Sequence, residues 1–188
     1  SGPQLNYDQW TKAFRDGRSF VTSGPLIQLR VNNREPGDDI KLPAGRHTLT
    51  IDAEVASITP ITEINVMHNG QIAHTIKPEK PENRTRVNKT IEIDRSGWVS
   101  LQVRAQYTRD PIRRPFPFAA TMPVWVTVDN KPVRSRQDAQ HFLDWMDRTL
   151  ARALQQDAWN NEAEKQQTRD LYQQARERMT ARANEDQP

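Results

Sequence analysis

The segment GRSFVTSGP, residues 17–25, holds three hydroxyl side chains and an arginine between two glycines. A serine can act as a hydrolase nucleophile in a G-x-S-x-G turn that joins a strand to a helix. Around Ser23 the first glycine of that motif is missing, and the pattern that follows is a strand. The spacing and the lysine of a phosphate-binding loop are missing as well. The segment therefore predicts a junction between a helix and a sheet, with Gly24 and Pro25 turning the chain.

Metal chemistry would need three or four converging ligands. The histidines show neither H-x-H nor H-x-x-x-H spacing; they are His47, His68, His74 and His141. We expect His74 to be a hydrogen-bonded histidine of the sheet interior, His68 a turn residue and His141 a helix-surface residue. Asp38 and Asp39 lie in a turn-rich loop and could hold calcium, although solvated loop acids are the commoner use of such a pair. We predict no metal site, no cofactor and no catalytic residue in this chain.

Arginines stand beside phenylalanines in YTRDPIRRPFPFAATMP, residues 107–123. Arg113 and Arg114 could bind a phosphate, a carboxylate or single-stranded nucleic acid. The alternative is a crossing loop held by buried phenylalanines, with its arginines in water, and this is favoured. Trp98 and Trp125 stand at positions of their predicted strands whose side chains point away from the core. They could form a platform for a sugar, or they could lie beneath the C-terminal helices, which need an apolar partner.

Bulk composition limits the classes of function. The 188 residues are 35% hydrophobic and 27% charged, with a formal net charge of +3 and no cysteine. Basic residues are diluted by acidic ones along the chain, so the sequence predicts a mixed solvated surface and no nucleic-acid partner. No apolar stretch approaches the length of a membrane span, so we expect a soluble chain with no membrane partner. The absence of cysteine fits both export and the cytoplasm; periplasmic or extracellular export is slightly favoured.

Two periodicities divide the elements that must position these residues. Apolar residues alternate from residue 19 to about 129 and then recur at helical spacing after 135. We predict a mainly β protein: an antiparallel β-sandwich of about eight strands in residues 1–133, with a short leading helix at 6–17, and a C-terminal α-helical hairpin in 134–188 packed on the sandwich. The predicted inward positions of the strands are Ile27, Leu29, Val31, Leu49, Ile51, Ala53, Val55, Val87, Ile91, Ile93, Val99, Leu101, Val103, Ala105, Tyr107, Val124, Val126 and Val128.

The hairpin in EINVMHNGQIAHTI can close in two ways. A two-residue turn at Asn69 and Gly70 would pair Met67 with Ile72. A three-residue loop with Gly70 as a bulge residue would pair Val66 with Ile72 instead. The second register places every apolar residue on one face, and we predict it for that reason.

The motifs occur in a recognisable order over residues 6–147. A helix containing Trp10 leads into GRSFVTSGPLIQLRVN and PGDDI. ITPITEINVMHNG, SGWVSLQVRA and AATMPVWVTVDNKPV follow, and then a helix with FLDWMD. This order resembles the C-terminal region of the carbaryl-hydrolase-like (CehA/McbA) metallohydrolases of the PHP type. GRSFVTSGP and ATMPVWV are its most specific parts.

The resemblance implies an accessory β-sandwich beside a PHP-type catalytic domain that lies upstream in the same parent chain. In such enzymes the divalent metal ions and the hydrolytic chemistry belong to that domain, and none of its metal-binding segments occurs here. No catalytic residue can therefore be carried over. The resemblance implies a non-catalytic module that packs on the catalytic domain and could complete its substrate cleft.

These interpretations give two sets of candidate residues. We expect Arg18, Thr22 and Arg104 at the domain interface. Ligand contact is expected from Arg113, Arg114, Trp98 and Trp125. Two alternatives stay open: a free-standing module that binds carbohydrate or a protein partner, and an autonomous hydrolase that would turn over substrate from this chain alone.

Overall fold

The computed structural model describes residues 6–107, 117–156 and 158–184. The chain divides into two compact units, Ser1–Val133 and Arg134–Pro188. In these described residues, the first unit contains helix α1 and ten strands, and the second contains helices α2 and α3. The predicted fold class, a mainly β sandwich with a short N-terminal helix and a C-terminal helical hairpin, is confirmed.

Helix α1 (Tyr7–Arg15) begins and ends as its sequence predicts. The side chain of Asn6 caps the first turn by accepting the backbone N–H of Asp8 at 2.9 Å. At the other end, Gly17 has φ +75°, and the N–H of Arg18 reaches back to the carbonyl of Ala13 at 2.8 Å. Together these form a Schellman motif, which needs glycine because the position is left-handed.

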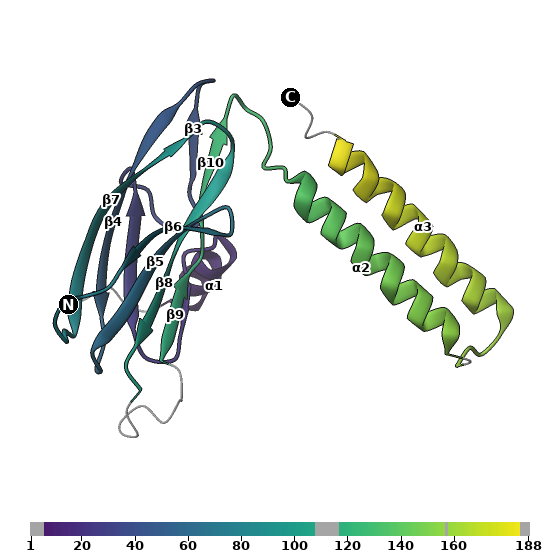
Figure 1. Cartoon of the computed structure of the whole chain (residues 1–188), viewed down its shortest axis with the longest axis horizontal. Coiled ribbons are helices and arrows are strands. Elements are labelled where there is room, and N and C mark those ends of the chain that lie inside the picture. Colours follow the sequence, from purple (N-terminus) through teal and green to yellow (C-terminus); the bar gives the residue numbers. More distant parts are fainter. Residues whose placement is uncertain (1–5, 108–116, 157, 185–188) are drawn as a thin grey trace. The chain divides into compact units, whose positions relative to one another are not determined.

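Two sheets form the sandwich (Figure 1). The smaller has the order β2-β4-β7, all antiparallel. In the larger sheet β8 lies at the centre. One edge of β8 pairs with β5, which in turn pairs with β6, and the other edge pairs with β9 and with β10. β1 pairs with the outer edge of β9 in antiparallel orientation, and β3 pairs with β10 in parallel orientation. The strands are β1 Phe20–Thr22, β2 Leu26–Val31, β3 Asp39–Leu42, β4 His47–Ala56, β5 Ile61–His68, β6 Gln71–Ile76, β7 Arg84–Ile93, β8 Gly97–Ala105, β9 Phe118–Thr121 and β10 Val124–Val128.

This connectivity matches the A-B-E and C′-C-F-G strand order of immunoglobulin-type sandwiches. The core lies between the sheets and is built from the alternating positions that the sequence marks. Leu49, Ile51, Val99, Leu101 and Val103 have essentially no exposed surface. Tyr107 is the exception among the predicted inward residues, because it lies beyond the end of β8 and is 51% exposed.

The predicted register of the β5–β6 hairpin is wrong. Met67 pairs with Ile72, so the turn contains only Asn69 and Gly70. Both turn residues have positive φ, 48° and 79°, which is the backbone of a type I′ turn that asparagine and glycine favour. The bulge lies instead at Ala73, between the partners of Val66 and Met67. Ile72 is consequently 56% exposed rather than part of the core.

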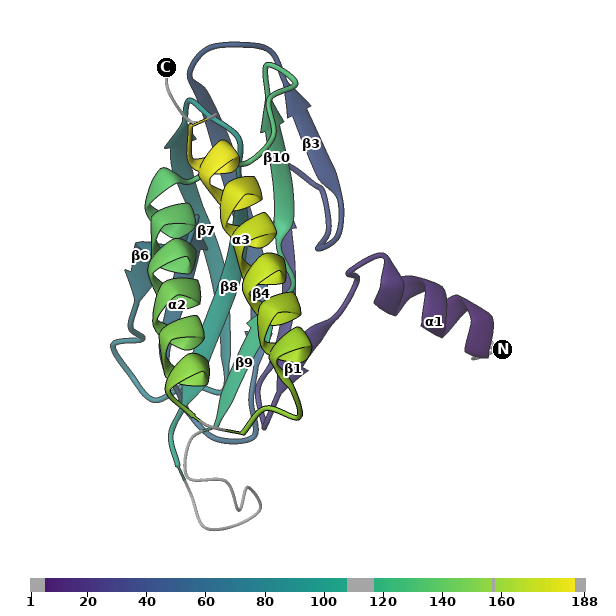
Figure 2. The same ribbon diagram turned by 90° about the vertical axis from the view of Figure 1, so that its right-hand side faces the viewer.

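Helices α2 (Arg136–Gln155) and α3 (Glu162–Asn184) lie side by side as an antiparallel hairpin (Figure 2). Ala139 and Leu143 of α2 and Ala183 of α3 are buried. Arg176 joins the helices by donating two hydrogen bonds to Asp147 at 3.0 and 3.2 Å, which lowers the pKa of that carboxyl group. Leu171 of α3, by contrast, is 64% exposed.

Among the described helices, none has a stretch long and apolar enough to cross a membrane. Packing of the helical hairpin on the sandwich stays a prediction.

Candidate functional site

Three segments that are distant in sequence meet at one corner of the sandwich unit. The segment 17–25 supplies β1, whose Phe20 pairs with Thr121 of β9. The segment 35–40 supplies the start of β3, whose Ile40 pairs with Val126 of β10. These segments are the ones whose motifs read GRSFVTSGP, PGDDI and ATMPVWV. These three segments therefore form one continuous structural feature, here called the corner.

Pro123 organises the corner because it breaks a strand. β9 ends at Thr121 and β10 begins at Val124. Proline has no N–H to give to a sheet, so the ladder is interrupted at this point. The hydroxyl of Thr121 accepts the buried N–H of Leu101 at 3.0 Å, at the point where β8 changes its partner from β9 to β10. The carbonyl of Pro123 accepts the N–H of Gly37 at 2.9 Å.

Gly17 and Gly37 allow helix α1 to approach the loop before β3. A Cβ atom placed on Gly37 would overlap the carbonyl oxygen of Asp16, and one placed on Gly17 would lie 3.3 Å from the Cα of Gly37. The guanidinium of Arg18 contacts Asp38 at 3.2 Å across the same junction. The C-terminal end of α1 is thus attached to the corner by backbone packing and one ion pair.

The rest of α1 exposes an aromatic stripe. Tyr7, Trp10 and Phe14 are 75%, 59% and 66% exposed, and no residue of the helix is buried. Their spacing of three and four residues places them on one helical face, with ring centroids 6.3 and 6.1 Å apart. Three adjacent exposed aromatic rings on one helix are unusual for a free surface.

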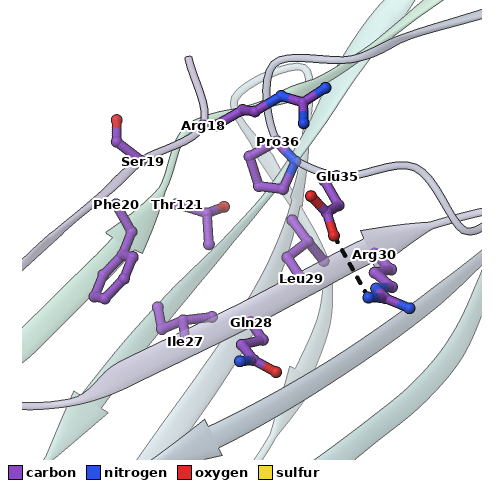
Figure 3. A pocket seen from close by; sticks show the side chains of 10 residues that line it. All are labelled: Arg18, Ser19, Phe20, Ile27, Gln28, Leu29, Arg30, Glu35, Pro36 and Thr121. Carbon is purple, nitrogen blue, oxygen red and sulfur yellow. Dashed lines mark hydrogen bonds and ion pairs between the residues drawn. The ribbon is translucent and has the colours of Figure 1, made fainter. Parts of the chain in front are cut away.

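A groove of about 290 Å³ lies beside this junction, between β1 of one sheet and β2 of the other (Figure 3). Ile27 and Leu29 are buried and lie on β2 along the groove, and Phe20 and Pro36 complete its apolar surface. Its polar surface comes from Arg18, Ser19, Gln28, Arg30, Glu35 and Thr121. Arg30 contacts Glu35 at 3.4 Å. The groove is therefore mixed in character, with an apolar interior and two guanidinium groups at its margin.

The predicted interface residues are only partly brought together. Arg18 lines the groove and joins α1 to the loop before β3. The hydroxyl of Thr22 accepts the N–H of Gly24 at 2.9 Å and donates to the carbonyl of Pro25 at 2.5 Å, so it shapes the turn after β1. Arg104 is exposed near the end of β8, opposite Glu63 of β5, and does not line the groove.

The predicted ligand residues have different outcomes. Arg113 and Arg114 lie outside the described residues. Trp98 and Trp125 are direct neighbours across β8 and β10, and Trp125 is 42% exposed. Directly opposed residues of an antiparallel pair point to the same face, so the two side chains share the outer face of the larger sheet. The predicted outward direction of both tryptophan side chains is therefore confirmed.

The acidic pair in PGDDI is used in hydrogen bonds. Asp38 contacts Arg18 and accepts the N–H of Glu35 at 3.1 Å. Asp39 accepts the hydroxyl of Thr127 with distances of 2.9 and 3.1 Å to its two oxygens. Within residues 6–107, 117–156 and 158–184, no three histidine or acidic side chains converge as metal ligands would.

Two histidine environments are defined in the sandwich unit. The Nε2 of His74 lies 2.9 Å from the carbonyl oxygen of Thr90, so the predicted hydrogen bond is present. The predicted place in the sheet interior is wrong, because His74 is only half-buried and is not a core residue. Partial burial and the nearby positive charge of Arg95 lower the pKa of His68, against the opposing effect of Asp94. Neither histidine lines the groove.

The site residues that sequence reasoning missed are Gly37, Thr121 and Phe20. Gly37 stands in a Pro-Gly pair, which signals a turn but not the helix end that packs against it. Thr121 stands just before a Met-Pro pair, which signals an interrupted strand. Phe20 lies in a strand of only three residues, which is too short for an alternating pattern to show that its side chain lines the groove.

Comparisons with known proteins identify no family. No family model matches the chain, and no curated protein does. Among solved structures, the neutron crystallographic structure of a lytic polysaccharide monooxygenase from Jonesia denitrificans matches with a TM-score of 0.26 and 15% identity. That match covers 50% of this chain and 60% of the other. The chain thus spans less than two thirds of the length of that structure.

Proposed function

We propose that this chain is a non-catalytic C-terminal accessory module of a PHP-type metal-dependent hydrolase, and that it packs on the catalytic domain of the same parent chain through helix α1. The observation that supports this proposal is the exposed stripe of Tyr7, Trp10 and Phe14 on a helix with no buried residue. Burying a large apolar side chain contributes about 1.5–3 kcal/mol, so three such rings favour a covered state. Tryptophan and tyrosine are also the side chains most enriched among interface residues that dominate binding.

The corner gives this helix a defined attachment. Gly17 and Gly37 pack backbone against backbone, and Arg18 pairs with Asp38. This attachment holds only the C-terminal end of the helix, and the aromatic side chains along the rest of it stay exposed. Arg18 is thereby a positioning residue of the proposed interface, and the exposed Arg104 is a further candidate for contact with the catalytic domain.

The divalent metal ions of such a hydrolase would be held by the catalytic domain. The described side chains of this chain do not fit a metal ion, since no three histidine or acidic groups converge and both acids of PGDDI are engaged elsewhere. This chain's part in the proposed function is therefore to bind and position the catalytic domain, and no step of hydrolysis is assigned to it.

The aromatic stripe tests the proposal. In the polypeptide that carries the catalytic domain directly before α1, Trp10→Ala is expected to lower the melting temperature of the joined domains. In the isolated module the same change is expected to shift stability by no more than about 0.5 kcal/mol, because the side chain is exposed there. Differential scanning calorimetry of both forms measures the two effects.

Trp145→Ala is the matched control, since Trp145 lies on α2 and is 56% exposed against 59% for Trp10. Equal effects of the two substitutions in the joined form would contradict the proposal. So would turnover of carbamate or phosphate esters by the isolated module in the presence of Mn²⁺.

A free-standing module that binds carbohydrate or a protein partner is the second candidate. The observation that favours it is the pair of Trp98 and Trp125 on one sheet face. Aromatic rings of this kind combine a flat apolar body with a polar N–H group, which suits the faces and hydroxyl groups of sugars.

The second candidate predicts that oligosaccharides quench the fluorescence of the isolated module and that Trp125→Ala removes this response. The accessory-module proposal predicts no change on titration. A glycan series that quenches the original chain and not the Trp125→Ala variant would therefore favour carbohydrate binding over domain docking.

A further inference from the structure

Among the described residues, β1 pairs with β9 alone, so its edge next to the groove is unpaired. The backbone carbonyl of Ser19 accepts the N–H of Met122 at 3.0 Å, and the backbone N–H of Ser23 donates to the carbonyl of Phe118 at 2.8 Å. Alternate residues of an antiparallel strand bond to the same neighbour. The N–H and C=O groups of the intervening Phe20 and Thr22 therefore point away from β9, toward the open edge.

The edge of β2 facing the same groove is also unpaired. The backbone N–H of Asn32 donates to the carbonyl of Thr50 of β4 at 2.9 Å. With the register of the two strands, this bond shows which residues of β2 direct their backbone groups toward β4. The backbone groups of Gln28 and Arg30 therefore face β4, and those of Ile27 and Leu29 face the open edge. In the part of the chain that the structure describes, β2 pairs only with β4.

The open edge of β2 has natural limits. Pro25 precedes it, and Arg34 closes its far end by exchanging backbone hydrogen bonds with Val31 at 2.8 and 2.9 Å. About four or five residues remain between these points, which is roughly 15 Å of extended strand. Open edges are normally covered, bulged or protected by charge, because they accept further strands.

Positively charged side chains outnumber negatively charged ones around the groove. Arg18 and Arg30 stand at its margin with exposed fractions of 52% and 61% for their side chains. Each contacts its carboxylate partner through one terminal nitrogen, at 3.2 and 3.4 Å. A guanidinium has five N–H donors, so both arginines can donate hydrogen bonds to an additional carboxylate. Among the described residues that line the groove, Glu35 is the one acid, against these two arginines.

We propose that the groove binds an extended acidic peptide segment of a protein partner, which adds as a strand to the open edge of β2. Its backbone pairs with Ile27 and Leu29, one set of alternate side chains enters the apolar part beside Phe20 and Pro36, and acidic side chains meet Arg18 and Arg30. This surface is separate from the aromatic stripe of α1, and the inference does not depend on the parent enzyme.

The test uses the whole chain and a synthetic probe. The probe is an acetylated, amidated heptapeptide in which valine and glutamate alternate. Titration followed by NMR is expected to shift the amide signals of Ile27 and Leu29 and to leave those of Trp98 and Trp125 unchanged. Methylating alternate backbone nitrogens of the probe on its pairing edge is expected to abolish binding, since strand addition requires those N–H groups. A heptapeptide of alternating valine and lysine is expected to bind at least tenfold more weakly.

Arg30→Gln should weaken binding of the glutamate probe about tenfold, which corresponds to about 1.4 kcal/mol. Arg86→Gln is the matched control, because Arg86 lies in the same sheet and pairs with Glu54 at 2.8 Å but does not line this groove. It should leave the affinity unchanged. Both arginines are exposed, so both variants are expected to fold, as circular dichroism can verify.

Several results would overturn the inference: no binding of the glutamate probe, equal binding of the methylated probe, or equal losses from the two arginine substitutions. A concentration-dependent dimer that protects the amides of Ile27 and Leu29 from exchange would overturn it as well, because a second copy of the chain would then occupy the edge. The Trp10→Ala experiment is unaffected by any of these outcomes.

Discussion

Gly37→Ala is expected to destabilise the sandwich unit by about 2–5 kcal/mol, through two effects that act at one position. Gly37 has φ +91°, where an L side chain is strained, and the new methyl group would overlap the carbonyl oxygen of Asp16. That oxygen belongs to the backbone at the end of α1, so it cannot move aside as a flexible side chain would. Relief requires α1 to separate from the loop before β3. The expected measurement is a lower midpoint in urea unfolding.

Gly45→Ala separates the two effects. Gly45 also has a positive φ, +126°, but a Cβ atom there meets nothing within 4 Å. This control should show only the backbone strain, which is about 1–3 kcal/mol. If Gly37→Ala is no more destabilising than Gly45→Ala, the close approach of α1 to the corner does not hold in solution.

The sandwich core could be predicted from sequence because it depends on a local pattern. In β4, Leu49, Ile51 and Val55 alternate with polar residues, and a strand of ten residues gives enough repeats to fix which face is inward. The same holds for Val99, Leu101 and Val103 in β8. Strands β3 and β9 contain only four residues each, so their alternation is too short to distinguish them from loop.

The hairpin register shows a different limit of the pattern. The pattern of apolar residues predicts a three-residue loop, because that loop collects Ile64, Val66 and Ile72 on one face. The backbone preference of Asn69-Gly70 for a type I′ turn prevails locally, and a bulge at Ala73 then places Ile76 opposite Ile64. Burial fixes the register far from the turn, whereas turn chemistry fixes it at the turn. A single rule applied to the whole hairpin was therefore wrong.

The candidate site could not be assembled from sequence, although its segments were recognised. GRSFVTSGP was predicted as a junction, and β1 does join α1 to the sheet. The contact of that junction with Gly37 and with the strand after Pro123 depends on pairings between residues about 20 and 100 positions apart. Local patterns carry no information on such pairings. They become visible only when strand order is known, and the order then explains why three separate motifs belong together.

Thr121→Val is expected to cost the sandwich unit about 1–3 kcal/mol, the usual penalty for leaving a buried N–H group unpaired. Valine matches threonine in shape, so packing is nearly preserved and the lost hydroxyl is the main change. Thr121 is 9% exposed, and its hydroxyl accepts the N–H of Leu101 at the break between β9 and β10. Urea unfolding measures the loss, and faster hydrogen exchange at the amide of Leu101 identifies its cause.

Thr127→Val is the matched control in the adjoining strand. The hydroxyl of Thr127 donates to Asp39 in an exposed position, so water can replace the lost bond and the expected change is below about 0.5 kcal/mol. If the two substitutions are equally mild, Leu101 obtains its hydrogen bond in another way and the side-chain bridge across the break is not needed. If only Thr121→Val is destabilising, the threonine supplies the hydrogen-bond acceptor that the sheet lacks where Pro123 interrupts the strand. The motif ATMPVWV then has a structural explanation.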